Sequence, residues 1–344
     1  MNRSIKGIRR KLIRIGFDIP LMGCIAFGLI DRGTNLIQVR PISSCPLSCV
    51  FCSTDAGPAS RNRASEFIIE DLDWLIDWFR SIVKLKGERK IEAHIDTVGD
   101  PLTYGKLVDL VQMLKDVKGV ETISMQTHGA FLDEKTAVNL AEAGLSRINL
   151  SIDSTDPHLA KKLSQTDWYD VKKIMEVAEF IAKNTKMDIL IAPIWIPGMN
   201  DHEIPRIIEF ALRIGAGKKV PPLGIQKYLI HKYGRKVKGI RPISWRKFYS
   251  KLREWSNRYQ VKLKLDPSDF KMHKRKRVPL VYKIGEVLRV KVFEDGWLRG
   301  EKLAVARDKR RVITLVNSEG IEIGSWVKAR IIGNKDNIYI ARPS

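Results

Sequence analysis

The sequence predicts an α/β protein built as a partial (β/α)6 barrel, followed by a small all-β, OB-like barrel. Three observations lead to this fold class. Apolar strand-like runs alternate with amphipathic stretches from about residue 36 to 228. Polar side chains recur at every second position of those runs. After Pro279 the pattern changes to short strands separated by turns, without a long helix.

The alternating region is a succession of six strands and five helices. The strands are expected at 36–41, 91–98, 121–128, 147–153, 187–196 and 222–228, and the helices between them at 69–84, 104–117, 134–144, 170–184 and 202–214. This alternation predicts a parallel sheet with right-handed crossovers. Six units are too few for an eight-fold barrel, so the alternation alone leaves an open doubly wound sheet and a partial barrel as alternatives.

The strand faces favour the barrel. Strands covered on both faces are nearly continuously apolar, whereas five of these strands carry polar residues at period two, which places them on one face of each strand. Those faces therefore point into one shared polar cavity, which suits an opened barrel that holds a large polar ligand. The polar sets are Gln38 and Arg40; Glu92, His94 and Asp96; Ser124, Gln126 and His128; Asn149, Ser151 and Asp153; and Gln226 and Tyr228.

The C-terminal part reads as five strands in about 60 residues, at 284–293, 301–307, 310–316, 326–332 and 337–341. Turn residues separate them, as in Gly333-Asn334-Lys335-Asp336. This pattern predicts a small closed barrel, an architecture that commonly binds oligonucleotides. We divide the chain into a basic N-terminal extension and hairpin (1–35), a core (36–228), a basic helical and linker segment (229–279) and the terminal barrel (280–344).

Charge is unevenly distributed over these segments. The chain has 61 Lys and Arg against 39 Asp and Glu, a net charge of +22. Residues 1–14 contribute +6, residues 227–278 contribute +15 and residues 282–344 contribute +5, which leaves −4 for residues 15–226. The excess of cations at both ends predicts a nucleic acid partner, because cations neutralise phosphates and release counterions. We expect Lys274, Arg275, Lys276 and Arg277 to contact RNA.

Composition also excludes several classes. The apolar fraction of 44% excludes global disorder, and no window approaches the 18–20 apolar residues of a membrane span. The N-terminus has no apolar signal-peptide core. We therefore expect a cytoplasmic protein without a membrane partner.

Three of the four cysteines lie within eight positions, as Cys45-x3-Cys49-x2-Cys52 directly after the first strand. Such clustering points to a metal site rather than to a disulfide framework. A zinc site would need a fourth ligand such as His, and no His lies within 40 residues of Cys52. Three soft thiolates favour an iron–sulfur cluster with one open iron.

The cysteine spacing, together with Phe51 before the last cysteine, resembles the radical S-adenosylmethionine (SAM) superfamily. The resemblance implies a [4Fe-4S] cluster on Cys45, Cys49 and Cys52, with SAM chelating the fourth iron. An electron donor would reduce the cluster, and SAM would then be cleaved to methionine and a 5′-deoxyadenosyl radical. Further motifs resemble the family's SAM-binding elements, and they imply contacts from Phe51, Gly99, Asp100, Pro101, Gln126, Thr127, Ser151, Asp153, Ile196 and Gly198.

The terminal barrel is similar to a TRAM domain, the RNA-binding barrel of radical SAM methylthiotransferases. Those enzymes hold a second cluster on three further cysteines, whereas this chain has one other cysteine, Cys24, so sulfur insertion is not expected. The chain most resembles an archaeal-type group of radical SAM proteins whose reaction the resemblance does not supply. The apolar neighbourhood of Cys24 favours a buried side chain over a catalytic thiol.

These observations give one leading hypothesis and two alternatives. The first is a radical SAM transferase that modifies a nucleoside in RNA, with tRNA as the favoured class. The second is an enzyme that modifies a ribosomal or other protein, and the third is a non-enzymatic iron–sulfur RNA-binding protein. Candidates to bind a flipped base or to tune proton transfer are His94, Asp96, His128 and Gln226, with Cys24 as a possible thiol donor. The sequence does not determine the oligomeric state.

Overall fold

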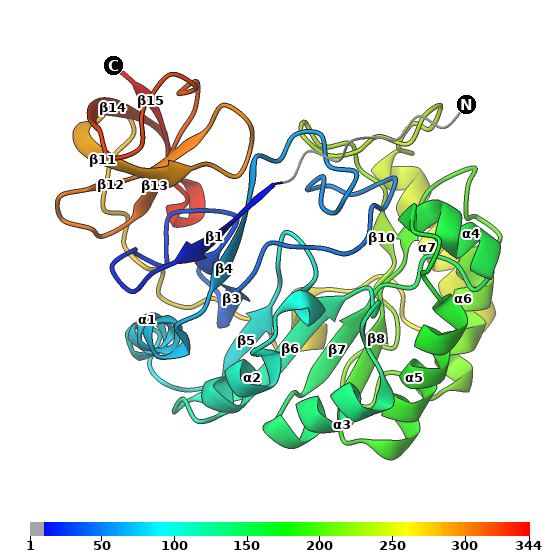
Figure 1. The fold of residues 1–344 in the computed structure, drawn as a ribbon. Coiled ribbons are helices and arrows are strands. Elements are labelled where there is room, and N and C mark those ends of the chain that lie inside the picture. The colour runs from blue at the N-terminus through cyan, green and yellow to red at the C-terminus, as the bar shows by residue number, and fades with distance from the viewer. Residues whose placement is uncertain (1–9) are drawn as a thin grey trace.

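A six-stranded sheet forms the centre of the α/β body (Figure 1). The computed structural model describes residues 10–344. All neighbouring strands of the sheet run parallel except the first pair, which is antiparallel. In spatial order the strands are β2 (Gly28–Asp31), β3 (Leu36–Arg40), β5 (Ile91–Ile95), β6 (Val120–Thr127), β7 (Arg147–Leu150) and β8 (Asp188–Ile191).

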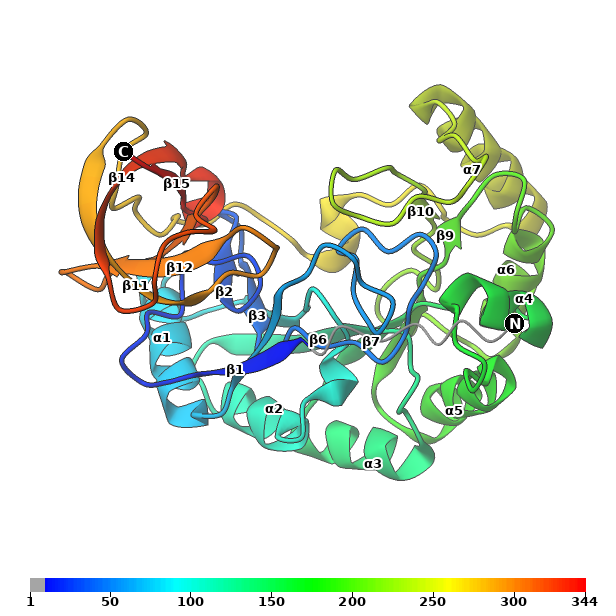
Figure 2. The same cartoon turned by 45° about the horizontal axis from the view of Figure 1, so that its top comes forward.

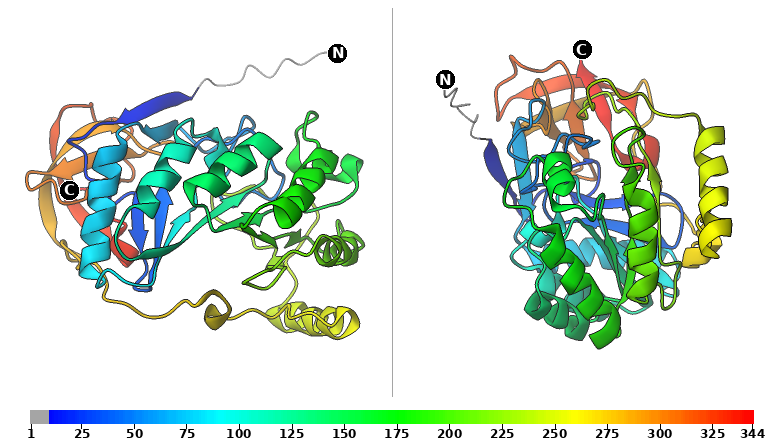
Figure 3. Two further views of the ribbon diagram at one scale, coloured as in Figure 1. Left: turned by 90° about the horizontal axis from the view of Figure 1, so that it is seen from below. Right: turned by 90° about the vertical axis from the view of Figure 1, so that its right-hand side faces the viewer.

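Helices cover the outer face of this sheet (Figure 3). They are α1 (Leu72–Leu85), α2 (Leu107–Lys115), α3 (Glu134–Ala143), α4 (Pro157–Ser164), α5 (Val171–Asn184) and α6 (Glu203–Arg213). An aspartate side chain caps four of them by accepting a backbone N–H in the first turn: Asp71, Asp133, Asp156 and Asp170. Among residues 10–344, none of the helices combines the length and apolar character that a membrane crossing requires.

Helix α4 is absent from the prediction, although Asp156-Pro157 is an N-cap followed by proline at the first helical position. The five helices that were predicted for the body are confirmed as α1, α2, α3, α5 and α6, and each end lies within three residues of the predicted one. A seventh helix, α7 (Trp245–Tyr259), follows the body and buries Phe248, Leu252 and Trp255. It lies with the linker on the side of the sheet opposite α1–α5 (Figure 3).

The sixth strand differs from the expected layout. The run 187–196 is divided into β8 and β9 (Ile194–Trp195), and β10 (Gln226–Lys227) pairs only with β9. Leu223 adds a single bridge to Ile191. Pro193 interrupts the run, and a proline cannot donate to a strand ladder, which explains the break. The body is therefore an open six-stranded α/β sheet, and the sixth unit of the expected (β/α)6 layout is reduced to the short pair β9–β10.

The N-terminal segment is also arranged differently from the expected hairpin. β1 (Lys11–Ile15) pairs in parallel with β4 (Ser65–Ile69), far along the chain. The hairpin joins β2 to β3, so the boundary expected at residue 35 falls inside it. The predicted basic residues Arg3, Lys6 and Arg9 lie outside the described residues.

The terminal barrel is closed, with strand order β11-β12-β13-β15-β14. Its strands are β11 (Val287–Asp295), β12 (Lys302–Ala306), β13 (Val312–Leu315), β14 (Trp326–Gly333) and β15 (Ile340–Pro343). The parallel pair β13–β15 completes the ring, and its interior is packed with small and branched apolar residues around Tyr339. The five predicted strands and the closed all-β architecture are confirmed.

The terminal barrel is not a detachable module. Leu303, Val305 and Val312 belong to the hydrophobic core of the α/β body. The backbone N–H groups of Val312 and Tyr339 donate to the carbonyls of Met22 and Gly23 at 2.8 and 2.9 Å. A Cβ at Gly23 would lie 2.0 Å from the Val312 carbonyl oxygen, so glycine allows this approach. Removing the barrel would uncover part of the main core.

Candidate functional site

The three clustered cysteines lie on a long loop, residues 41–64, which joins the C-terminal end of β3 to β4; we call it the cysteine loop. The loop is folded back on itself, since the Cys52 N–H donates to the Cys49 carbonyl at 3.1 Å. Gly57 has φ +86°, and a Cβ there would lie 1.6 Å from the Leu47 carbonyl oxygen. Only glycine permits this close turn. The loop thus carries Cys45, Cys49 and Cys52 over the carboxyl ends of the parallel strands.

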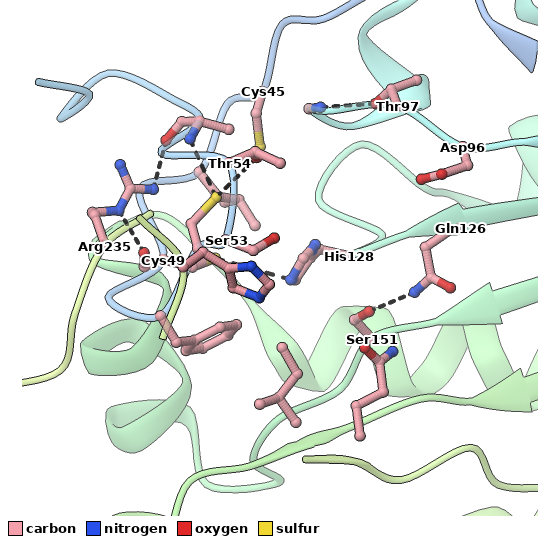
Figure 4. Close-up of a pocket in the computed structure, with 18 of the residues that line it drawn as sticks. Cys45, Cys49, Ser53, Thr54, Asp96, Thr97, Gln126, His128, Ser151 and Arg235 are labelled. Carbon is pink, nitrogen blue, oxygen red and sulfur yellow. Dashed lines mark hydrogen bonds between the residues drawn. The ribbon is translucent and has the colours of Figure 1, made fainter. Parts of the chain in front are cut away.

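A cavity of about 430 Å³ opens between the cysteine loop and the strand ends (Figure 4). In Figure 4 the loop and Arg235 lie on one side, and Asp96, Gln126 and Ser151 lie on the other. All three clustered cysteines line the cavity. The predicted residues that also line it are Phe51, His94, Asp96, Gly99, Gln126, Thr127, His128, Ser151 and Gln226. The shared polar cavity expected from the strand pattern therefore exists.

The cysteine site fits an iron–sulfur cluster by its donor set. Burial raises the pKa of Cys45 and Cys49 well above the ordinary range, so these thiols need a strongly positive partner to ionise. In residues 10–344 no three His, Cys, Asp or Glu side chains are grouped to hold one metal ion. In a cubane, by contrast, each thiolate binds its own iron. The cavity beside the three thiols provides the space for such a cluster.

The Gly99-Asp100-Pro101 motif follows β5, and its three residues differ in position: one faces the cavity and two are buried behind it. Gly99 lines the cavity, and a Cβ there would lie 2.0 Å from a carbonyl oxygen of the cysteine loop. Asp100 is buried and does not line the cavity; its carboxylate accepts bonds from Thr127 Oγ1 at 2.7 and 2.9 Å and from the His128 N–H at 3.0 Å. Pro101 is buried at the first position of a short 3₁₀ helix. Asp100 and Pro101 shape the site rather than contact its ligand.

Strands β6 and β7 present a second group of side chains. Gln126 Nε2 donates to Ser151 Oγ at 2.8 Å, and both side chains face the cavity. His128 Nε2 lies 3.9 Å from Cys49 Sγ and 3.9 Å from Asp153 Oδ2. Asp153 is buried behind Cys49, where burial raises the pKa of its carboxyl group. It accepts the Ile194 N–H at 2.7 Å and therefore supports the cavity wall.

The turn after β9 also acts from behind the wall. Asn200 is fully buried; its side chain accepts the Ile196 N–H at 2.7 Å and donates to the carbonyls of Asp153 and Ile194, both at 2.8 Å. Ile196 and Gly198, which the resemblance placed at the cofactor, do not line the cavity, whereas Ile194 does. The chain turns at Pro197, and Ile196 packs into the hydrophobic core instead of facing the cavity.

A hydrogen-bonded column connects the cavity with the opposite end of the strands. Arg147 pairs with Glu92 at 2.6 Å, Ser124 Oγ donates to the same carboxylate at 2.6 Å, and His94 Nδ1 lies 2.7 Å from Ser124 Oγ. Since Ser124 donates to Glu92, it accepts from His94, which leaves His94 Nε2 as the acceptor. Burial lowers the pKa of His94, so the cavity contains a neutral imidazole.

Cys24 does not reach the cavity. It is buried in the main hydrophobic core, its Sγ accepts the Ala26 N–H at 3.4 Å, and burial raises the pKa of the thiol to about 11. The structure therefore supports the buried role and not the catalytic one.

Arg235 is a site residue that sequence reasoning missed. It lies on the segment 228–244 between β10 and α7, which we call the strap. Its guanidinium donates to the carbonyls of Cys49 at 2.6 Å and Ala56 at 2.5 Å and pairs with Asp55 at 3.0 Å. No local pattern marks this arginine, because its partners lie in a loop far earlier in the chain.

The basic run Lys274–Arg277 lies away from the cavity. The Arg275 N–H donates to the Gly33 carbonyl, and Arg277 Nη2 donates to the Arg32 carbonyl. These partners precede β3, whereas the cysteine loop follows it. The run is therefore fastened at the end of the strands opposite the cysteines.

Comparisons with known proteins agree with this geometry. A model of the "Radical SAM superfamily" matches residues 39–211. An uncharacterized protein of Methanocaldococcus jannaschii is 44% identical over 358 residues, which cover 99% of this chain and 82% of that protein. The GTP 3′,8-cyclase of Rhizobium etli is 30% identical over 191 residues, 54% of this chain and 51% of the cyclase, so this chain spans about half the length of that relative.

Among solved structures, SuiB of Streptococcus suis bound to S-adenosylmethionine is 14% identical and covers 66% of this chain and 45% of its own, with a TM-score of 0.47. The region that the family model matches, residues 39–211, contains the cysteine loop and the strands β5, β6, β7 and β8. The expected cofactors are a [4Fe-4S] cluster on Cys45, Cys49 and Cys52 and SAM beside it, and the match to the family model supports both cofactors. The chain belongs to the radical SAM superfamily.

Proposed function

We propose that this radical SAM enzyme modifies a nucleoside in RNA, with tRNA as the first class to test. Cys45, Cys49 and Cys52 would hold the cluster, and with one electron supplied the bound cofactors would give methionine and a 5′-deoxyadenosyl radical able to remove a hydrogen atom from the substrate. The observation that carries the proposal is the rim of the cavity. Gln226, Lys227, Tyr228, Leu229, His231 and Arg235 line the cavity and belong to a continuous basic segment.

The charge of this segment favours a polyanion. Residues 226–253 contain ten Lys and Arg and no Asp or Glu. Lys232, Lys236 and Lys238 on the strap are exposed, so they are free to meet phosphates. Two large rings on the same segment are also exposed, Tyr233 at 47% and Trp245 at 51%. Exposed rings beside cations are the features on which unpaired bases stack.

The terminal barrel lies beside the cysteine loop and offers a second surface for RNA. It is a closed five-stranded barrel, and we propose that it is a TRAM-like RNA-binding domain. The Ala64 N–H donates to the Trp297 carbonyl, and the Arg299 N–H donates to the Asn62 carbonyl, both at 2.9 Å. Figure 2 shows the barrel and α7 at opposite ends of the crescent-shaped body, with the cysteine loop between them. An RNA that contacts both elements would span the loop.

The size of the cavity limits what can enter. A volume of about 430 Å³ is in the range of small-molecule pockets, so the cavity does not admit a stacked helix. The target nucleotide must therefore be flipped out of its stack. The neutral His94, together with Asp96 and Gln226, offers both donors and acceptors to a base. A nucleotide target also agrees with the relative from Rhizobium etli, which is a GTP 3′,8-cyclase.

The proposal can be tested by incubating the reconstituted enzyme with reductant, SAM and bulk tRNA, and then analysing nucleosides by mass spectrometry. We expect a nucleoside of altered mass that requires all three components. In a parallel arm, ribosomal proteins are incubated under the same conditions and analysed as peptides. A modified peptide with unmodified nucleosides would replace the RNA proposal by the protein alternative.

A further inference from the structure

The strap and the cysteine loop are far apart in the sequence, and several hydrogen bonds and an ion pair join them. The Arg235 N–H donates to the Cys52 carbonyl at 2.8 Å, in addition to the three side-chain contacts to Cys49, Ala56 and Asp55. The preceding Gly234 packs closely enough that a Cβ would lie 2.8 Å from the carbonyl oxygens of Cys52 and Ser53. The backbone around two of the three cysteines is therefore held by the strap.

Asp55 explains why a single arginine can control this loop. Asp55 is buried, and its second carboxylate oxygen accepts the N–H groups of Arg61 and Asn62, both at 2.8 Å. Arg235 binds the first oxygen. Removing the guanidinium would leave a buried carboxylate without its cation and the Ala56 carbonyl without this donor, and the Cys49 carbonyl would keep only the Cys52 N–H. Losing the partner of a buried charge is costly.

Asn62 extends the connection to the terminal barrel. Its Nδ2 donates to the Tyr233 carbonyl of the strap at 2.9 Å, and its own carbonyl accepts the Arg299 N–H of the barrel. The adjacent Arg63 is fully buried, with its guanidinium 5.0 Å from the Trp297 ring centre. The cysteine loop, the strap and the barrel therefore meet at residues 62 and 63.

We propose that Arg235 is a positioning residue through which RNA bound on the strap and SAM bound at the cysteine loop increase each other's affinity. This inference rests on the proposed function for the identity of the polyanion. The Arg235 side chain is only 14% exposed, and each of its three guanidinium nitrogens contacts the loop, so it does not compete for phosphate. Exposed neighbours such as Lys236 bind the RNA, whereas Arg235 transmits the position of the strap to the loop. Coupling of this kind is reciprocal.

The first measurement concerns the loop alone. Arg235→Ala and Arg235→Lys are reconstituted anaerobically, with Arg80→Ala on the exposed face of α1 as the matched arginine control. We expect all three to hold about four irons. Arg235→Ala should bind SAM at least about tenfold more weakly and lose the SAM-induced change in the electron paramagnetic resonance spectrum of the reduced cluster, Arg235→Lys should recover part of both, and Arg80→Ala should match the unaltered protein.

If Arg235→Ala does not load iron, Gly234→Ala serves as the second variant. It keeps the guanidinium but forces the strap away from the Cys52 carbonyl, so we expect the same weakening of SAM binding. Unchanged SAM affinity and spectra in a folded, iron-loaded Arg235→Ala or Gly234→Ala variant would overturn the positioning role.

The second measurement concerns coupling. Saturating tRNA should raise the SAM affinity of the unaltered protein at least about fivefold, a typical size for such coupling, and should have no such effect on Arg235→Lys or Asn62→Ala. Equal enhancement in the unaltered protein and the variants would overturn the role of Arg235 in coupling. If tRNA does not bind at all while Arg235→Ala still weakens SAM binding, the proposed RNA function fails and the positioning of the loop stands.

Discussion

Two basic stretches, the strap (228–244) and the run Lys274–Arg277, lie at opposite ends of the same strand, β3. The strap lies at the carboxyl end of β3 beside the cysteine loop, and its cations Lys232, Lys236 and Lys238 are exposed. The second run lies at the amino end of β3, where the side chains of Arg275 and Arg277 donate to the backbone carbonyls of Arg89 and Arg32. Charge along the sequence is therefore a poor guide to surface position, because one run borders the cavity and the other fastens the linker.

This contrast predicts that substitutions at the cavity end abolish chemistry or binding, whereas substitutions at the far end reduce stability. The largest effect should come from replacing Cys45, Cys49 and Cys52 together by Ala. Reconstituted iron should fall from about four atoms to none, and SAM cleavage should be lost. Iron analysis and chromatography of 5′-deoxyadenosine measure both. The control Cys24→Ala should keep its iron, and loss of iron in that variant would contradict its placement in the core.

The next effect is on stability at the far end. Glu92→Gln leaves Arg147 buried without its partner, which should reduce the free energy of unfolding by about 3–5 kcal/mol. Urea denaturation measures this change. The matched control, Glu179→Gln, breaks an exposed pair with Lys183 and should leave the midpoint unchanged. Equal urea midpoints for both variants would show that the hydrogen-bonded column from Arg147 to His94 does not stabilise the α/β body.

A smaller effect separates the two basic stretches directly. Neutralising Lys232, Lys236 and Lys238 to Gln should reduce the slope of log K for tRNA against log salt by roughly two units, at about 0.7 per lost phosphate contact. Neutralising Lys274 and Lys276 should change it by less than about one unit. Filter binding at several salt concentrations measures both slopes. A larger change from the second pair would reverse the assignment of the two stretches.

The smallest effect is the pH dependence contributed by His94. Its pKa is lowered by burial, so below about pH 6.5 the unfolded state takes up a proton that the folded state resists. The stability contributed by neutral His94 is therefore present above that pH and decreases as the pH falls. Thermal unfolding between pH 7.5 and 5.5 should show a smaller decrease for His94→Gln than for the unaltered protein. His158→Gln, on the exposed face of α4, should show the full decrease.

Much of the fold follows from local patterns. The period-two polar positions correctly predicted that His94 of β5 and Gln126 of β6 share one cavity, because the pleat of a strand fixes which face a side chain takes. That rule stops where the strand ends. Asp100 and Asp153 follow the ends of β5 and β7, and their side chains are buried behind the residues that line the cavity.

Contacts between distant segments are the part that the sequence does not reveal. Arg235 has no spacing relative to the cysteines that would single it out among the many cations of its segment. The attachment of the terminal barrel is equally hidden, since Leu303 and Val305 look like ordinary strand residues although they pack into the main core. A barrel that shares this core cannot be removed without exposing apolar surface, so truncation at residue 280 should destabilise the body instead of leaving SAM cleavage intact.

The central claim is that the radical formed at the cysteine loop removes hydrogen from an RNA nucleoside at the mouth of the cavity. The most direct test uses tRNA prepared from cells grown in deuterated medium, incubated with enzyme, reductant and unlabelled SAM. We predict that the 5′-deoxyadenosine product gains one deuterium with labelled tRNA and none with unlabelled tRNA. Deuterium transfer from labelled ribosomal protein, with none from labelled tRNA, would contradict the account.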